Sequence, residues 1–199
     1  MVREFDALKS SRLKTGSAFK RPAQNLLEHV ALSDPAIAAM TDLSKVSVVV
    51  ARSNASIDSA NAKMIRYGVR MLLVIDSNDQ VAGLLTASDV LGEKPMRFLQ
   101  NMGGTYAEIM VRDIMTTQRE LEVLKIEDVQ NAEVGQIVAT LKKSGRQHAL
   151  VASEGADGKQ TVCGIFSLTQ IARQLGAEVQ GFQLAHTLAE IDAVVSSGH

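Results

Sequence analysis

The chain has 199 residues and a formal net charge of −1, with 46% apolar and 22% charged residues, as in ordinary globular proteins. This balance gives no overall field that would attract nucleic acid or a membrane surface. Aromatic residues make up 4% and tryptophan is absent, which argues against a protein that stacks single-stranded bases. The single cysteine, Cys163, cannot form an internal disulfide, and no apolar run approaches the roughly 20 residues of a membrane helix. We therefore expect a cytoplasmic protein without a structural zinc site.

Residues 1–37 are predicted to form a basic arm, since Lys and Arg outnumber Asp and Glu there. We expect the arm to pack on the rest of the chain or on a partner subunit. A contact with nucleic acid or with an acidic partner is the alternative, but no recognition motif for nucleic acid accompanies the basic residues.

Residues 38–92 contain the first of two similar patterns. An apolar run at 46–50 predicts a strand. A helix follows, because Ser56 is a suitable N-cap, Gly68 is a suitable C-terminal stop, and apolar residues recur between them at helical spacing. These apolar residues are Ile57, Ala60, Met64 and Ile65. The elements expected after Gly68 are a strand at Met71–Ile75, a strand ending in Gly83-Leu84-Leu85, and a short helix at Ala87–Leu91.

Residues 110–176 repeat this pattern after a linker at 93–109. The recurring motifs are Met40-Thr41 and Met115-Thr116, Gly68 and Gly145, and Gly83-Leu84-Leu85-Thr86 and Gly164-Ile165-Phe166-Ser167. The elements expected in this copy are a strand at 121–126, a helix with Val134, Ile137, Val138 and Leu141 on its apolar face, strands at 148–152 and up to Phe166, and a helix at 168–175.

Each copy therefore has the order β-α-β-β-α, which places the chain in the α/β (α+β) class. A unit of about 60 residues buries too little surface to be stable alone. The repeat predicts an intramolecular pseudo-dimer, in which two units share a core and leave a cleft between them.

The repeated motifs resemble the cystathionine-β-synthase (CBS) domain family. The first copy has Gly68-Val-Arg-Met-Leu-Leu-Val-Ile-Asp76 and Gly83-Leu-Leu-Thr-Ala-Ser-Asp89, which are similar to the family's central strand and its closing Gly-x-x-Thr/Ser-x-x-Asp. The second copy has Gly145-Arg-Gln-His-Ala-Leu-Val151 and Gly164-Ile-Phe-Ser-Leu-Thr-Gln170. The resemblance covers about residues 38–175 and extends to small stand-alone CBS-pair proteins of bacteria. It implies a disc-like Bateman module with two equivalent clefts, which in many relatives hold AMP, ADP, ATP or S-adenosylmethionine.

The resemblance also implies which residues bind such a ligand. The first-copy set is Thr41, Arg70, Thr86 and Asp89, and the second-copy set is Thr116, Arg146, His148, Ser167 and Gln170. A carboxylate such as Asp89 can accept hydrogen bonds from both ribose hydroxyls, a hydroxyl such as Thr86 can donate to phosphate, and Arg70 can neutralise phosphate charge. Gln170 stands where the second Asp would be. We therefore expect one adenosine site built on Asp89 and one altered or empty site.

Structural interpretations of the same residues remain open. Asp89 and Thr86 are also suited to cap the short helix that follows, Arg70 to lie in solvent, and His148 to be a hydrogen-bonded residue of its strand. The sequence contains no Walker loop, no His-Glu-x-x-His and no Gly-x-Ser-x-Gly, and its histidines lack metal-ligand spacing, so we expect neither an enzyme nor a metal site.

The tail at 177–199 is predicted to be an amphipathic helix, with Leu184, Leu188, Ile191 and Val195 on one face. This face needs a cover, which could be its own unit, a client protein or, our first choice, the second subunit of a homodimer. Two functions remain open. The first is a regulatory module that senses an adenosine-type ligand and signals to an unknown client protein. The alternative is a structural or dimerisation protein with empty clefts that acts through its C-terminal helix.

Overall fold

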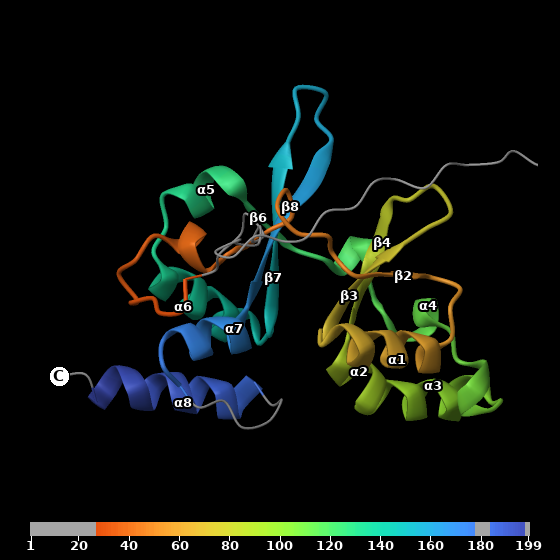
Figure 1. Cartoon of the computed structure of the whole chain (residues 1–199). Helices are drawn as coiled ribbons and strands as arrows, with labels where there is room; N and C mark the ends of the chain where they lie inside the picture. Colours follow the sequence, from red (N-terminus) through yellow and green to blue (C-terminus); the bar gives the residue numbers. More distant parts are fainter. Residues whose placement is uncertain (1–26, 178–183, 198–199) are drawn as a thin grey trace, which may run out of the picture.

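Two four-stranded sheets organise the structure, a computed structural model that describes residues 27–177 and 184–197 (Figure 1). One sheet has the strand order β2-β3-β4-β5 and the other has the order β1-β8-β7-β6. The strands are β1 (Thr41–Asp42), β2 (Val50–Arg52), β3 (Met71–Ile75), β4 (Val81–Thr86), β5 (Thr116–Thr117), β6 (Val123–Lys125), β7 (His148–Glu154) and β8 (Gln160–Ser167). The helices are α1 (Ile57–Tyr67), α2 (Ala87–Leu91), α3 (Lys94–Met102), α4 (Val111–Ile114), α5 (Ile126–Gln130), α6 (Val134–Ser144), α7 (Leu168–Gln174) and α8 (Leu184–Ser197), with 3-10 turns η1 (Ala36–Ala39), η2 (Tyr106–Glu108) and η3 (Gln118–Glu120).

The expected α/β class and the repeated β-α-β-β-α order are confirmed. The first copy is β2-α1-β3-β4-α2 and the second is β6-α6-β7-β8-α7, with the short α5 inserted after β6. In each copy the first strand (β2 or β6) is parallel to the second (β3 or β7). The second and third strands (β3 and β4, or β7 and β8) form an antiparallel hairpin.

Helix α1 illustrates how local sequence sets these elements. The Ser56 hydroxyl accepts a hydrogen bond from the Ser59 amide at 3.2 Å, which caps the first turn. The helix ends at Gly68, whose φ of 62° is left-handed and suits glycine. Ile57 is fully buried as expected, but Ile65 is 74% exposed, because it lies outside the stripe that faces the sheet.

The edge strands cross between the two copies. β1, which opens the first copy, pairs with β8 of the second, with Thr41 opposite Ile165. β5, near the start of the second copy, pairs with β4 of the first, with Thr116 opposite Leu84. Each sheet is therefore completed by the strand that opens the other copy.

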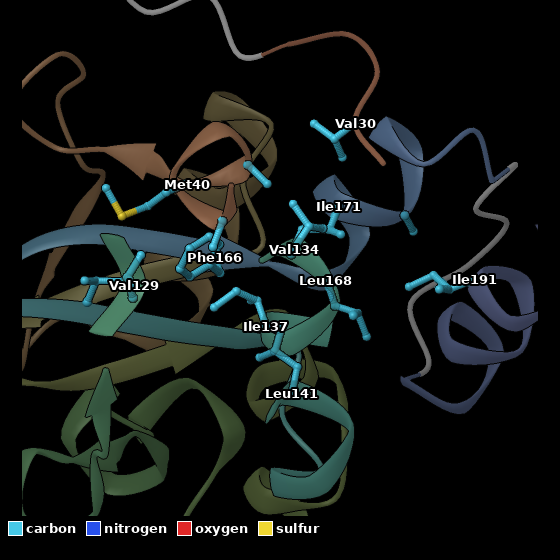
Figure 2. Packing of buried hydrophobic residues seen from close by; sticks show 14 of the residues in the cluster. Val30, Met40, Val129, Val134, Ile137, Leu141, Phe166, Leu168, Ile171 and Ile191 are labelled. Carbon is cyan, nitrogen blue, oxygen red and sulfur yellow. The ribbon is translucent and has the colours of Figure 1, made fainter. Parts of the chain in front are cut away.

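Three apolar clusters hold the molecule together. One lies between α1, α2 and the first sheet, and a second lies between α6, α7 and the second sheet, where Phe166 is fully buried (Figure 2). The third joins the two copies and consists of Met71, Leu73, Leu84, Leu150 and Ile165, drawn from β3, β4, β7 and β8. This shared cluster is the core that the pseudo-dimer required.

Helix α8 packs on its own chain, which corrects the expectation that its apolar face is a homodimer contact. Ile191 is 2% exposed within the single chain and belongs to the cluster of the second copy (Figure 2). Leu188 and Val195 pack against the same cluster. The Lys142 ammonium also pairs with the Asp192 carboxylate at 3.2 Å. The face is thus covered by α6 and α7, which offer both an apolar surface and a matching charge.

Two further segments differ from the sequence-based expectations. The strand expected at 46–50 is found at Val50–Arg52, and the segment expected as a linker at 93–109 contains α3 and η2. Residues 1–26 of the predicted arm lie outside the described residues, but the Val30 amide donates to the Gln174 carbonyl at 2.9 Å, so the end of the arm contacts the second copy. None of the helices in 27–177 and 184–197 combines the length and the apolar character that a membrane span requires.

Candidate ligand-binding clefts

Two clefts lie between the copies, and both are bordered by His148 of β7. The first, here called the Asp89 cleft, has a volume of about 410 Å³; its polar lining residues include Thr86, Ser88, Asp89, Thr116, Glu122 and Arg146. The second, the Arg173 cleft, has a volume of about 370 Å³; its polar lining residues include Thr41, Ser47, Arg70, Ser167, Gln170 and Arg173. Both volumes lie within the range of about 300–1,000 Å³ that is typical of small-molecule sites.

The crossed edge strands decide which residues meet in each cleft. β5 brings Thr116 beside Thr86 and Asp89, whereas β1 brings Thr41 beside Ser167 and Gln170. All nine predicted ligand-binding residues line at least one of the two clefts, and His148 lines both. Their grouping differs from the sequence-based sets, because each cleft combines the closing motif of one copy with the opening threonine of the other. Arg70 consequently lines the cleft of Gln170, and Arg146 lines the cleft of Asp89.

Asp89 is a helix cap as well as a cleft residue. Its Oδ2 accepts hydrogen bonds from the Thr86 amide at 2.8 Å and the Thr86 hydroxyl at 2.7 Å, and the Asp89 amide donates back to that hydroxyl at 3.2 Å. This reciprocal pattern is a capping box at the start of α2. Oδ1 pairs with the Lys94 ammonium at 2.7 Å. The structural interpretation of Asp89 and Thr86 as caps therefore holds, and it leaves part of the carboxylate facing the cleft.

The guanidinium of Arg146 is paired within the Asp89 cleft. Its Nη1 lies 3.3 Å from the Glu122 carboxylate, and its Nη2 donates to the Glu120 carbonyl at 3.4 Å. The positive charge that Arg146 contributes to this cleft is therefore offset by Glu122.

His148 is neutral at physiological pH. Burial, and to a smaller extent the nearby positive charge of Arg70, lower the pKa of its imidazole from 6.5 to about 4 against the opposing effect of Asp89. Its Nδ1 is buried, and no group in the described part of the chain forms a hydrogen bond with it. At neutral pH the imidazole is therefore a neutral donor and acceptor between the two clefts.

The Arg173 cleft is the more positive of the two. Burial, followed by repulsion from the charge of Arg173, lowers the pKa of Arg70 from its usual value. Ser167 makes no capping hydrogen bond, unlike its counterpart Thr86, so its hydroxyl is not used by the helix behind it. Gln170 adds a neutral amide in place of a carboxylate.

The sequence analysis did not identify Lys94 or Arg173 as residues of the candidate site. Arg173 lies three residues after Gln170 on α7, a helical spacing that places the two side chains on one face, and this spacing could have indicated it. Lys94 could not be found in that way, because its contact with Asp89 depends on the turn between α2 and α3. Among the described residues, no group of three or more His, Cys, Asp or Glu side chains is placed to hold a metal ion.

Comparison with known families assigns the first unit to a family, because residues 39–95 match the sequence profile of the CBS domain. These residues are a CBS domain. The second unit repeats its order of elements, so the chain has the architecture of a tandem CBS pair. No curated protein matches the chain at a significant level.

Solved structures share this fold. The chain is 22% identical to an uncharacterised conserved protein from Pyrococcus horikoshii, with a TM-score of 0.53 over 77% of this chain and 100% of that one. It is 23% identical to CBSX2 in complex with AMP (TM-score 0.49; 70% and 93% covered), a CBS-pair protein also solved from Arabidopsis thaliana. It is 18% identical to the CBS domain protein TA0289 from Thermoplasma acidophilum (TM-score 0.49; 79% and 78% covered). At identities of 18–23%, this similarity is evidence for a shared fold.

Proposed function

We propose that this chain is a non-catalytic regulatory module that binds an adenosine-containing nucleotide between its two CBS units and signals to a partner protein. The observation that carries the proposal is the convergence of Asp89, Thr86 and Thr116, from both copies, on one cleft of about 410 Å³. A carboxylate offers about four lone-pair positions, of which Thr86 occupies two and Lys94 one. A ribose diol needs two, so binding requires the exposed Lys94 side chain to withdraw from Asp89.

Signalling requires that the ligand favours one arrangement of the chain over another. The clefts lie between units that are joined by the shared cluster and by the crossed strands β1 and β5, and a ligand that spans both units would bias their relative position. A change in the partner surface would follow from that bias.

Thermal unfolding with AMP, ADP, ATP and S-adenosylmethionine tests the proposal. A ligand present at about 100 times its Kd adds about 2.7 kcal/mol to the free energy of unfolding. For a chain of this size, the melting temperature should then rise by about 5–10 °C.

The matched variants are Asp89→Asn and Asp113→Asn. Asp113 also accepts a backbone hydrogen bond at a helix start, from the Met110 amide at 2.8 Å, but it lines neither cleft. Asp89→Asn should lose the ligand-induced rise and Asp113→Asn should keep it. Equal rises in both variants, or none with any ligand in the unaltered protein, would refute the adenosine site.

A structural or dimerisation protein is the second candidate, and one observation favours it. Helices α2 and α3 expose large apolar side chains, with Leu91 69%, Met96 58% and Met102 73% exposed. We propose this surface, rather than α8, as the contact with a second copy or a client protein. Analytical ultracentrifugation of the unaltered chain and of Met96→Glu tests it: a dimer that Met96→Glu dissociates supports the surface, and a dimer that resists the change excludes it.

A further inference from the structure

Helix α7 borders the Arg173 cleft on one side and the contact with α8 on the other. Gln170 and Arg173 of α7 line the cleft. The opposite side of α7 is fully buried in the apolar cluster that also contains Ile191 of α8; its residues there are Leu168, Ile171 and Ala172. In Figure 1, α7 lies between the second sheet and α8. A movement of α7 at the cleft therefore also changes the surface on which α8 packs.

The contact that holds α8 is small and partly polar. Of the α8 side chains that the structure describes, Thr187 and Ile191 are the buried ones. Thr187 and Gln174 of α7 are also the two buried polar side chains in the described part of the chain. The Lys142–Asp192 ion pair is exposed to solvent on both sides, so it adds little. Burial of one side chain of the size of isoleucine favours the docked helix by about ten- to hundred-fold.

Gln174 shows that this side of α7 is incompletely satisfied. Its Nε2 donates to the Leu27 carbonyl at 2.8 Å, and its main-chain carbonyl accepts from the Val30 amide at 2.9 Å. Its Oε1 is buried, and no hydrogen-bond donor for it is found within residues 27–177 and 184–197. A buried acceptor without a partner costs free energy, which contact with water would recover. Opening of the structure on this side of α7 is therefore less unfavourable than opening of a purely apolar contact.

Close packing sets the direction in which the cleft acts on α8. Leu168, Ile171 and Ala172 are each 0% exposed, so α7 has no free space on its buried side. A group that fills the Arg173 cleft and pushes α7 away must therefore displace a neighbour of α7. Helix α8, which is held mainly by Ile191, is the neighbour that is displaced at the lowest cost.

We propose that α8 is a releasable output helix, and that a compound which fills the Arg173 cleft releases it through α7. Residues 184–197 include Glu190 and Asp192 but neither Lys nor Arg, and docked α8 faces the ammonium of Lys142. The partner that fits released α8 is a protein with an apolar groove for the face marked by Ile191 and basic side chains at the edge of that groove. This inference rests on the proposed regulatory function and deepens it, because it names the element that carries the signal.

Hydrogen–deuterium exchange of the full chain, resolved by peptide, tests whether α8 is released separately. A free helix of 14 residues is marginal in water, so the amides of α8 exchange whenever it leaves α7. In the unaltered chain α8 should exchange about ten-fold or more faster than α6, since α8 opens locally and α6 opens with its whole unit. Equal rates in α8 and α6 would overturn the proposal.

Ser47→Trp tests the coupling without a ligand. Ser47 is an exposed residue outside the helices and strands, and it lines the Arg173 cleft. The control is Ser77→Trp, at an exposed position of the β3–β4 turn that lines neither cleft. Ser47→Trp should speed the exchange of α8 by about three-fold or more, and Ser77→Trp should leave it within about 1.5-fold. Unchanged or slower exchange of α8 with the cleft filled would overturn the coupling.

The introduced ring reports its own position, because the chain has no other tryptophan. A blue-shifted emission shows that the ring is buried, and slow exchange of α6 shows that the protein is folded. If Ser47→Trp is unfolded or leaves the ring in solvent, Val46→Trp, at another lining position, takes its place under the same criteria.

AMP separates this inference from the proposed function. Faster exchange of α8 with AMP, together with the Ser47→Trp effect, would support both. If AMP protects cleft segments without affecting α8 but Ser47→Trp still speeds α8, the release stands and AMP is assigned to the other cleft. If neither AMP nor Ser47→Trp affects α8 while AMP protects cleft segments, the release is refuted and the sensor remains. A Ser47→Trp effect in a chain whose exchange AMP alters nowhere would support the release and refute AMP sensing.

Discussion

Gly83→Ala should be among the most damaging single-atom changes in the first CBS unit. Gly83 of β4 pairs with Thr117 of β5, and an added Cβ would lie closer than 3.0 Å to the backbone carbonyl of Thr116. A carbonyl oxygen in a strand cannot swing aside as a side chain can, so β5 itself must move away. Overpacking of this kind costs about 1–3 kcal/mol, and each backbone hydrogen bond lost from the β4–β5 pair adds about 1 kcal/mol. We expect a total of about 3 kcal/mol.

A loss of about 3 kcal/mol corresponds to a fall of roughly 6–12 °C in melting temperature for a chain of this size. Differential scanning calorimetry without ligand measures it. The matched variant is Gly164→Ala, at the corresponding position of β8, where the added Cβ would meet the side chain of Met40 and not a backbone atom. Because a methionine side chain can adjust its rotamer, we expect a cost of about 1 kcal/mol there. A Gly83→Ala protein as stable as Gly164→Ala would refute the reasoning that the crossed strand is rigidly seated on Gly83.

Three further outcomes follow from the same structure. The pKa of His148 is about 4 in the folded chain and near 6.5 when unfolded, so the stability gained by keeping its imidazole neutral is complete above pH 6.5 and is lost as pH falls toward 4. Urea unfolding should therefore show about 2 kcal/mol less stability at pH 5 than at pH 7, and His148→Gln should reduce this difference. Lys94→Ala should tighten binding of a ribose-containing ligand several-fold by releasing Asp89, and calorimetric titration that shows unchanged or weaker binding would contradict that role. Deletion of 178–199 should lower stability by about 2–3 kcal/mol through exposure of the partners of Ile191, and an unchanged denaturation midpoint would show that α8 contributes nothing to the core.

Local signals in the sequence were sufficient to predict the bounds of the strands and helices that caps and turns define. Met71–Ile75 and Ala87–Leu91 were predicted with the bounds that the structure has, since a left-handed glycine before the first and a capping threonine before the second fix them within a few residues. The strand expected at 46–50 was misplaced, because an apolar run marks burial and not pairing. Residues 46–49 line the Arg173 cleft instead, and regular pairing begins at Val50.

Contacts between distant segments could not be predicted in the same way. β1 and β5 are two residues long, too short to show any period, and each pairs with a strand of the other copy. The candidate site residues were therefore predicted one by one, and the structure groups them in the two clefts with other companions than their own copies offered. The exchange of companions also explains why the charge of each cleft was not apparent from either copy alone.

The exchange of β1 and β5 has a consequence for dividing the chain. A cut anywhere in 93–109 leaves each fragment carrying the edge strand that belongs to the other fragment's sheet. Neither fragment would have a complete sheet or a complete cleft, but the two would be complementary to each other. Such halves are suited to reconstitution on mixing, so that recovery of ligand binding would report their reunion.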